Sequence, residues 1–187
     1  IALLHDAAYT EVTYDGYVAP SVLQAEGAMD IAMEFHSLSK TANMTGWRVG
    51  FASGNPEMVN ALMRVKSNID SGLSQANQEM GIAALDLPSV WVDNNNAVYQ
   101  KRRDKVVSVL NEIGVPAVAP KGALYIWTPI PEGYTSAEFA QKLLDEVNVV
   151  VTPGNGYGPG GEGYIRLSLT IPDDQIDEGL RRLAQLR

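Results

Sequence analysis

The sequence contains no cysteine and only two histidines, His5 and His36, among its 187 residues. Without cysteine the chain can form no disulfide and has no thiolate metal ligand and no thiol nucleophile. The two histidines lie 31 positions apart with no matching acidic cluster. We therefore expect neither a metal site nor a Ser-His-Asp triad, and we predict that both rings pack at strand ends.

Basic residues and long apolar runs are also scarce. Fourteen basic against twenty-two acidic side chains give a formal charge of -8, which disfavours nucleic acid or an anionic membrane as a partner. No segment reaches the ~18 consecutive apolar residues of a membrane-spanning helix, and the first residues lack the basic start of a signal peptide. We predict a cytoplasmic protein.

The remaining composition is that of a folded protein, with 45% hydrophobic and 19% charged residues. In the first half we predict strands over 1–4, 31–35 and 47–52, a helix from Pro56 and another over about 74–85. The apolar run 1–4 reads as a buried parallel strand, and a chain that starts inside such a strand looks truncated. This half therefore has an α/β pattern.

The second half follows a different, α+β order. A long helix is expected from Pro88 to about Ile113, and we place a domain boundary near residue 97. Beyond it we predict strands over 124–127, 147–151 and 164–169, a helix opened by the capping box of Thr135 and Glu138, and a last helix over 173–186.

The most informative segment runs from Phe35 to Gly50 and reads FHSLSKTANMTGWRVG. It places Lys40 just beyond the carboxyl end of a predicted strand, where open α/β sheets bind ligands. A lysine amine can form a Schiff base with an aldehyde. A nearby hydroxyl and guanidinium, such as those of Ser37 and Arg48, can hold a phosphate. A solvated surface lysine is the alternative.

This motif resembles that of the class I/II, fold-type I aminotransferases, which use pyridoxal 5'-phosphate (PLP) and carry Ser-x-Ser-Lys followed by Gly-x-Arg-x-Gly. Family members are roughly twice as long, so the resemblance implies the C-terminal half of such an enzyme. Residues 1–97 would be the C-terminal part of the PLP-binding large domain, with a mostly parallel sheet and helices, and 98–187 the small domain. Lys40 would bind PLP and later act as the base, and Ser37, Arg48 and, less directly, Ser39 would bind its phosphate.

Two further motifs fit the same family. The sequence from His5 to Tyr9 resembles its Asp-x-x-Tyr, which implies that Asp6 faces the pyridine nitrogen and that Tyr9 donates to the phenolate oxygen of the ring. Arg166 matches the arginine that holds the substrate α-carboxylate. The alternatives are a capping Asp with a half-buried Tyr, and an arginine in a surface ion pair.

A glycine-rich segment, 153–161, could be mistaken for a nucleotide loop. It is followed by a predicted strand instead of a helix, and it has no Lys-Ser/Thr. It resembles the family's Pro-Gly-x-x-Phe-Gly loop, with Tyr157 at the aromatic position, which implies backbone close to the substrate.

Segments 9–17 and 65–72 are similar to the LL-diaminopimelate aminotransferases of lysine biosynthesis, which exchange an amine between a diamino dicarboxylic acid and 2-oxoglutarate. That resemblance implies a homodimer in which Asn68 enters the neighbouring subunit's pocket, although a polar loop tip explains it equally well.

The resemblance also assigns several cofactor contacts to the N-terminal half, among them the aromatic residue that stacks on the ring. We therefore expect that the 187 residues alone cannot transaminate. A PLP-dependent β-lyase or racemase and a non-catalytic PLP-binding regulatory module remain as alternatives.

Overall fold

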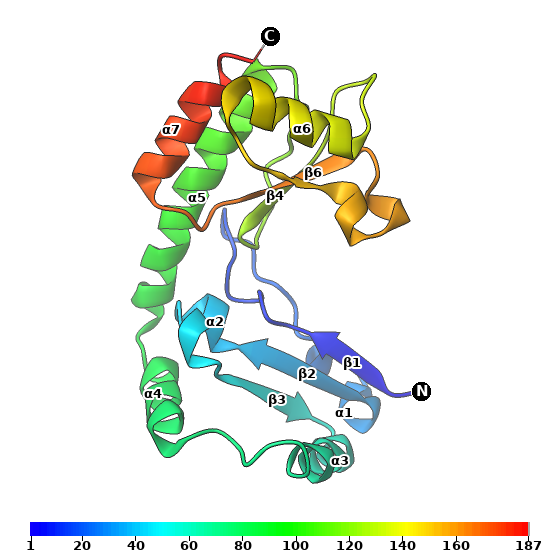
Figure 1. Cartoon of the computed structure of the whole chain (residues 1–187). Helices are drawn as coiled ribbons and strands as arrows, with labels where there is room; N and C mark the ends of the chain where they lie inside the picture. The colour runs from blue at the N-terminus through cyan, green and yellow to red at the C-terminus, as the bar shows by residue number, and fades with distance from the viewer. Residues whose placement is uncertain (187) are drawn as a thin grey trace. The chain divides into compact units, whose positions relative to one another are not determined.

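A computed structural model describes residues 1–186 of the chain. They divide into two compact units, with the boundary between residues 95 and 96 (Figure 1). No helix of the described residues is both long and apolar enough to cross a membrane.

The first unit contains a three-stranded sheet in the order β1 (Leu3–Asp6), β2 (Ala32–Ser37), β3 (Gly50–Gly54). Strands β1 and β2 run parallel, whereas β3 returns antiparallel to β2 after a short connection. Its α-helices are α1 (Ala28–Ile31), α2 (Leu38–Thr41), α3 (Pro56–Lys66) and α4 (Gln75–Leu85). The short helix α2 follows β2 directly, so it lies at the carboxyl end of the central strand.

Local caps fix where the longer helices begin. Asn55 caps α3 by accepting a hydrogen bond from the Met58 amide at 3.0 Å, with Pro56 as the first helical residue. Ser74 caps α4 in the same way by accepting from the Asn77 amide. The long helix α5 (Ser89–Glu112) follows Pro88 and crosses the boundary between the units. These helices confirm the two predictions made from Pro56 and Pro88 and the one made from the periodicity of 74–85.

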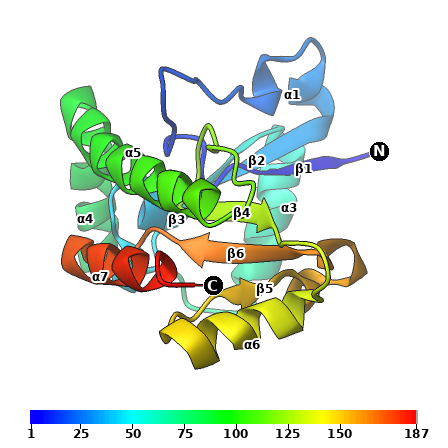
Figure 2. The same cartoon turned by 90° about the horizontal axis from the view of Figure 1, so that it is seen from above.

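The second unit has an antiparallel sheet in the order β4 (Tyr125–Pro129), β6 (Tyr164–Ser168), β5 (Thr152–Pro153) (Figure 2). Helices α6 (Ser136–Val147) and α7 (Asp173–Leu183) complete it, and α6 begins with the predicted capping box. Arg102 of α5 pairs with Asp173 of α7 at 2.6 Å. The core consists of side chains with at most 1% exposure, namely Leu110, Val115, Ile126, Phe139, Leu143, Ile165 and Leu169.

Three strand predictions were wrong in part. No strand covers 147–151, because Val147 ends α6 and Asn148 caps it in the left-handed region (φ 53°). The third strand begins at Gly50 instead of residue 47, because Thr45–Trp47 form a 3-10 turn and Arg48 is left-handed (φ 57°). The first strand covers Leu3–Asp6, and Leu3 and Leu4 are 42% and 61% exposed instead of buried, since β1 is an edge strand of this sheet. The other predicted element boundaries differ by at most three residues.

Candidate cofactor site

Lys40 lies on α2, three residues after the end of β2. The Leu38 amide at the start of this helix donates to the Val49 carbonyl at 3.1 Å, which ties the turn to the segment before β3. The Nζ atom of Lys40 lies 5.5 Å from the centre of the Tyr9 ring, on the loop that follows β1. The fold thus brings together two predicted site residues that are 31 positions apart.

The predicted phosphate ligands lie around the same turn. Ser37 is half-buried and pairs with Gly50 across the sheet, so the turn that contains Arg48 lies next to the end of β2. Arg48 is exposed, and its Nη1 donates to the Thr45 carbonyl at 3.1 Å. Ser39 is only 6% exposed, and its carbonyl accepts from the Thr45 hydroxyl. Ser37 and Arg48 are therefore more accessible to a phosphate than Ser39.

Asp6 is the last residue of β1 and pairs in register with Phe35 of β2. Its carboxylate is exposed and accepts a long hydrogen bond, 3.4 Å, from the Ala8 amide. The Ala7 amide continues the sheet by donating to the Phe35 carbonyl at 2.8 Å. Asp6 therefore occupies the same sheet end as Lys40, one strand away.

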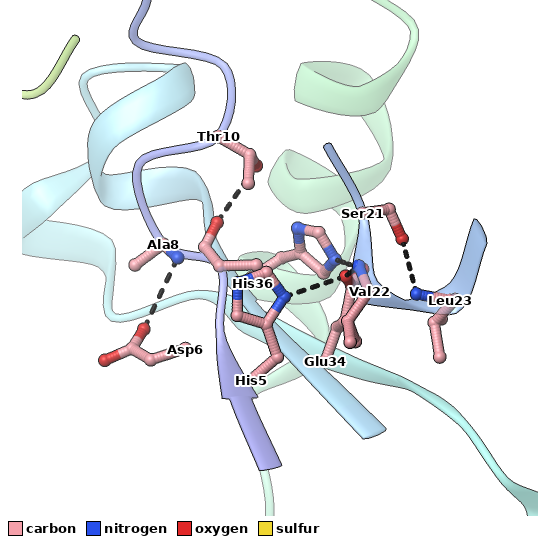
Figure 3. A network of polar contacts seen from close by, with 10 residues as sticks. His5, Asp6, Ala8, Thr10, Ser21, Val22, Leu23, Glu34 and His36 are labelled. Atoms are coloured by element: carbon pink, nitrogen blue, oxygen red, sulfur yellow. Dashed lines mark hydrogen bonds and ion pairs between the residues drawn. The ribbon is translucent and has the colours of Figure 1, made fainter. Parts of the chain in front are cut away.

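The two histidines share an acidic partner that the sequence did not reveal. His5 Nδ1 lies 2.9 Å from Glu34 Oε1, and His36 Nε2 lies 3.2 Å from Glu34 Oε2 (Figure 3). His36 also stacks on Phe51, with ring centres 4.8 Å apart. The rings lie on strands, as predicted, and the single carboxylate between them was not anticipated from the sequence. The parallel register that sets His5 opposite Glu34 joins positions 29 apart, and the alternation of Glu34 and His36 on one strand face was the available signal.

Glu34 is 2% exposed and ionised. Burial raises the pKa of this carboxyl, but hydrogen bonds from His5, Ser21, the Val22 amide and His36 together lower it to about 2. The Val22 contact is short, with 2.6 Å between the amide nitrogen and Oε1. No group of three or more His, Cys, Asp or Glu side chains in residues 1–186 is arranged to hold a metal ion.

Arg166 belongs to the second unit and lies on β6. Its guanidinium carbon sits 4.2 Å from the centre of the Tyr125 ring and 4.9 Å from that of Tyr157. Among the described residues no ion pair of Arg166 is found, and its Nε is buried without a hydrogen-bond partner. The surface ion pair considered for this arginine is thus not formed, and its charge remains available to an external carboxylate.

The remaining predicted residues lie in loops. Asn68 is exposed just beyond α3, and its side-chain amide donates to the Arg64 carbonyl at 2.7 Å. The glycine-rich segment forms two 3-10 turns in which Gly154 and Gly161 approach each other so closely that a Cβ on either would clash with the other's carbonyl oxygen. The close approach of the two backbones therefore explains why both positions are glycine, without any contact to a ligand.

The sequence matches the model of aminotransferase class I and II over residues 1–183. The chain belongs to this family. It is 57% identical over 184 residues to an LL-diaminopimelate aminotransferase of Dehalococcoides mccartyi (strain BAV1), which covers 98% of this chain and 47% of that protein. The chain is 50% identical to an LL-diaminopimelate aminotransferase of Moorella thermoacetica, and the alignment covers 100% of this chain and 48% of that protein. The chain therefore spans about half the length of the curated relatives it matches.

Solved structures agree with this membership. Substrate-bound BacF from Bacillus subtilis has a TM-score of 0.93 at 33% identity, covering 100% of this chain and 48% of that one. A probable N-succinyldiaminopimelate aminotransferase from Thermus thermophilus has a TM-score of 0.92 at 34% identity, covering 100% and 50%. The predicted family and the α/β fold of the fold-type I aminotransferases are confirmed.

Proposed function

We propose that this chain supplies the lysine-bearing half of a PLP-dependent aminotransferase, which moves an amine between an amino acid and a 2-oxo acid. The observation that carries the proposal is the position of Lys40 at the carboxyl end of β2, 5.5 Å from the Tyr9 ring. The groups around it fit PLP: an amine for the aldehyde, a hydroxyl and a guanidinium for the phosphate, and a carboxylate and a phenol for the ring. When bound, PLP supplies an aldehyde and an electron-accepting ring.

Each residue has a separate task in this proposal. The Lys40 Nζ would hold the cofactor aldehyde covalently, and after a substrate amine has displaced it, the free Nζ amine would take the proton from the substrate Cα. The Asp6 carboxylate holds a proton on the pyridine nitrogen by Coulomb attraction, and the Tyr9 hydroxyl donates to the phenolate oxygen. Ser37 and Arg48 hold the phosphate, with Ser39 in a lesser part. Arg166 binds the substrate carboxylate and thereby orients the Cα–H bond.

Identity above 50% to relatives named LL-diaminopimelate aminotransferase supports LL-diaminopimelate as the amino donor and 2-oxoglutarate as the acceptor. We extend the proposal to a cytoplasmic homodimer of lysine biosynthesis in which Asn68 reaches the neighbouring subunit's pocket. Its exposed position beyond α3 leaves it accessible to such a partner.

The experiment uses a hybrid protein in which this chain replaces the matching 47% of the Dehalococcoides mccartyi relative. With PLP, the hybrid should develop the absorbance of a lysine-bound cofactor, and Lys40→Ala should abolish that absorbance. In a single turnover, LL-diaminopimelate should give a 2-oxo acid and pyridoxamine phosphate, at least ten times faster than aspartate or phenylalanine. Ammonia and pyruvate released from a β-substituted amino acid would instead indicate a lyase.

A further inference from the structure

Glu34 gathers three separate segments of the first unit. Its two carboxylate oxygens contact His5 of β1, His36 of β2 itself, and the backbone amide of Val22, in the loop between the two strands (Figure 3). The carboxylate is 2% exposed, so water cannot replace these partners. All three contacts are within hydrogen-bond distance, between 2.6 and 3.2 Å.

Each of these segments also carries a residue proposed to contact the cofactor. His5 immediately precedes Asp6, and the two side chains point to opposite sides of β1 (Figure 3). Glu34 and His36 lie on the strand that leads through Ser37 to Lys40. Tyr9 lies on the loop that follows β1 and leads to Val22. One carboxylate therefore links the three backbone segments on which the proposed anchor, counter-charge and phenol depend.

The contacts of Glu34 depend on its negative charge, because a buried carboxylate is stable only when donors surround it. If Glu34 became glutamine, an NH2 group would replace one carboxylate oxygen, so either His36 or both His5 and the Val22 amide would lose their acceptor. The donors that remained bonded would face a neutral carbonyl oxygen in place of a carboxylate. The segments would still be connected by the pairing of β1 and β2, but the hydrogen bond from the Val22 amide would be lost or made to a neutral oxygen, which weakens the link to the loop. The expected result is a folded unit whose cofactor contacts are less well aligned.

We propose that Glu34 is a positioning residue, which holds Asp6, Tyr9 and Lys40 in the arrangement that PLP requires. The proposal rests on the proposed function. Glu34 itself touches no cofactor atom in this role, because it acts from the opposite side of β1 through His5, and through the Val22 amide.

The test compares Glu34→Gln with two controls in the hybrid protein. Glu178→Gln makes the same change in a carboxylate of α7 that arginines hold ionised, and Val115→Ala removes core volume from the second unit. We would measure the PLP dissociation constant, the pKa of the bound chromophore from its absorbance, and the melting temperature without PLP. If Glu34→Gln does not fold, His5→Gln provides the second variant, with a smaller shift in the same direction.

We expect Glu34→Gln to weaken PLP binding on the order of tenfold. It should also raise the chromophore pKa, because the Asp6 and Tyr9 contacts that favour the deprotonated form are loosened. Val115→Ala should lower only the melting temperature, and Glu178→Gln should leave both cofactor readouts unchanged. A Glu34→Gln protein that melts earlier but keeps the wild-type PLP affinity and chromophore pKa would overturn the proposal. A wild-type hybrid that never binds PLP, or a Lys40→Ala variant that keeps the chromophore, would count against the proposed function instead.

Discussion

At the scale of single residues, Glu34 should make the stability of the first unit depend on pH. Its pKa is lowered from 4.5 to about 2 in the folded chain, so its stabilising contribution is complete above pH 4.5 and is lost as the pH falls toward 2. A shift of this size corresponds to at most about 3 kcal/mol. Urea unfolding of the hybrid should show Glu34→Gln less stable than wild type at pH 6, with the gap closing between pH 4.5 and 2.

Carboxylates elsewhere in the protein titrate in the same range. They are present in both wild type and Glu34→Gln, so their effects cancel in the difference between the two free energies of unfolding. Glu178→Gln provides the comparison for an exposed carboxylate whose pKa is also lowered to about 2, by Arg181 and Arg182. Its gap to wild type should be much smaller at every pH, since solvent screens the pair. A gap that stays constant from pH 6 to pH 2 for Glu34→Gln would contradict the expected linkage.

Some residues of the candidate site could be predicted from the sequence, and others could not. Lys40, Asp6 and Tyr9 were predicted as site residues because short motifs surround them, and the structure places Lys40 beside Tyr9. The contacts of Glu34, on which its proposed role rests, were not predicted, because they come from the register of β1 on β2 and from a loop amide, neither of which leaves a local pattern. Residues that bind a ligand can belong to a recognisable sequence motif. A residue that positions those ligand-binding residues is recognised only from contacts in the folded structure.

At the scale of elements, strand β3 should position the end of β2. Gly50 of β3 pairs with Ser37, and a Cβ at Gly50 would lie 2.7 Å from the His36 carbonyl oxygen. Gly50→Ala must therefore push β3 away from β2. The shift would occur next to Ser37 and to helix α2, which carries Lys40. We expect PLP binding by the hybrid to weaken on the order of tenfold, measured by absorbance titration.

Gly54, at the other end of β3, provides the matched control. A Cβ there would clash with the backbone of Ala32 and Met33, and its φ of 137° is unfavourable for alanine. Gly54→Ala should lower the melting temperature at least as much as Gly50→Ala, while the folded protein keeps its PLP affinity. Equal losses of affinity in both variants would mean that the glycines serve the sheet as a whole.

The elements that the sequence predicted well are those with a local signal at their ends. Asn55 with Pro56, Ser74, and Thr135 with Glu138 each fix a helix start through hydrogen bonds within one turn. The valine-rich stretch 147–151 was misread, because its β-branched residues favour a strand while the helix before it continues to Val147. Strand pairing depends on contacts that are distant in the sequence, so the register of the sheets could not be derived from it.

At the scale of the whole molecule, the chain combines two units with different sheets, and it covers about half of its relatives. The first unit exposes apolar side chains along its strands and helices, among them Leu4, Met63, Val65 and Ile69. Surface of this kind is characteristic of a face that packs against further protein. It fits the view that the cofactor site needs protein beyond these residues.

This view gives a prediction for the chain alone. The isolated 187 residues should show no transamination of LL-diaminopimelate with 2-oxoglutarate above the rate of free PLP. The proposed counter-charge and phosphate ligands of the site lie in this chain, but the ring-stacking residue is one that the resemblance places elsewhere. Adding the first half of the Dehalococcoides mccartyi relative as a separate chain should restore activity to within about tenfold of the covalent hybrid, since buried apolar surface drives the association. Activity is measured as glutamate formed, with Lys40→Ala in the added mixture as the control. Turnover by the isolated chain that Lys40→Ala abolishes would show that these residues form a sufficient site by themselves.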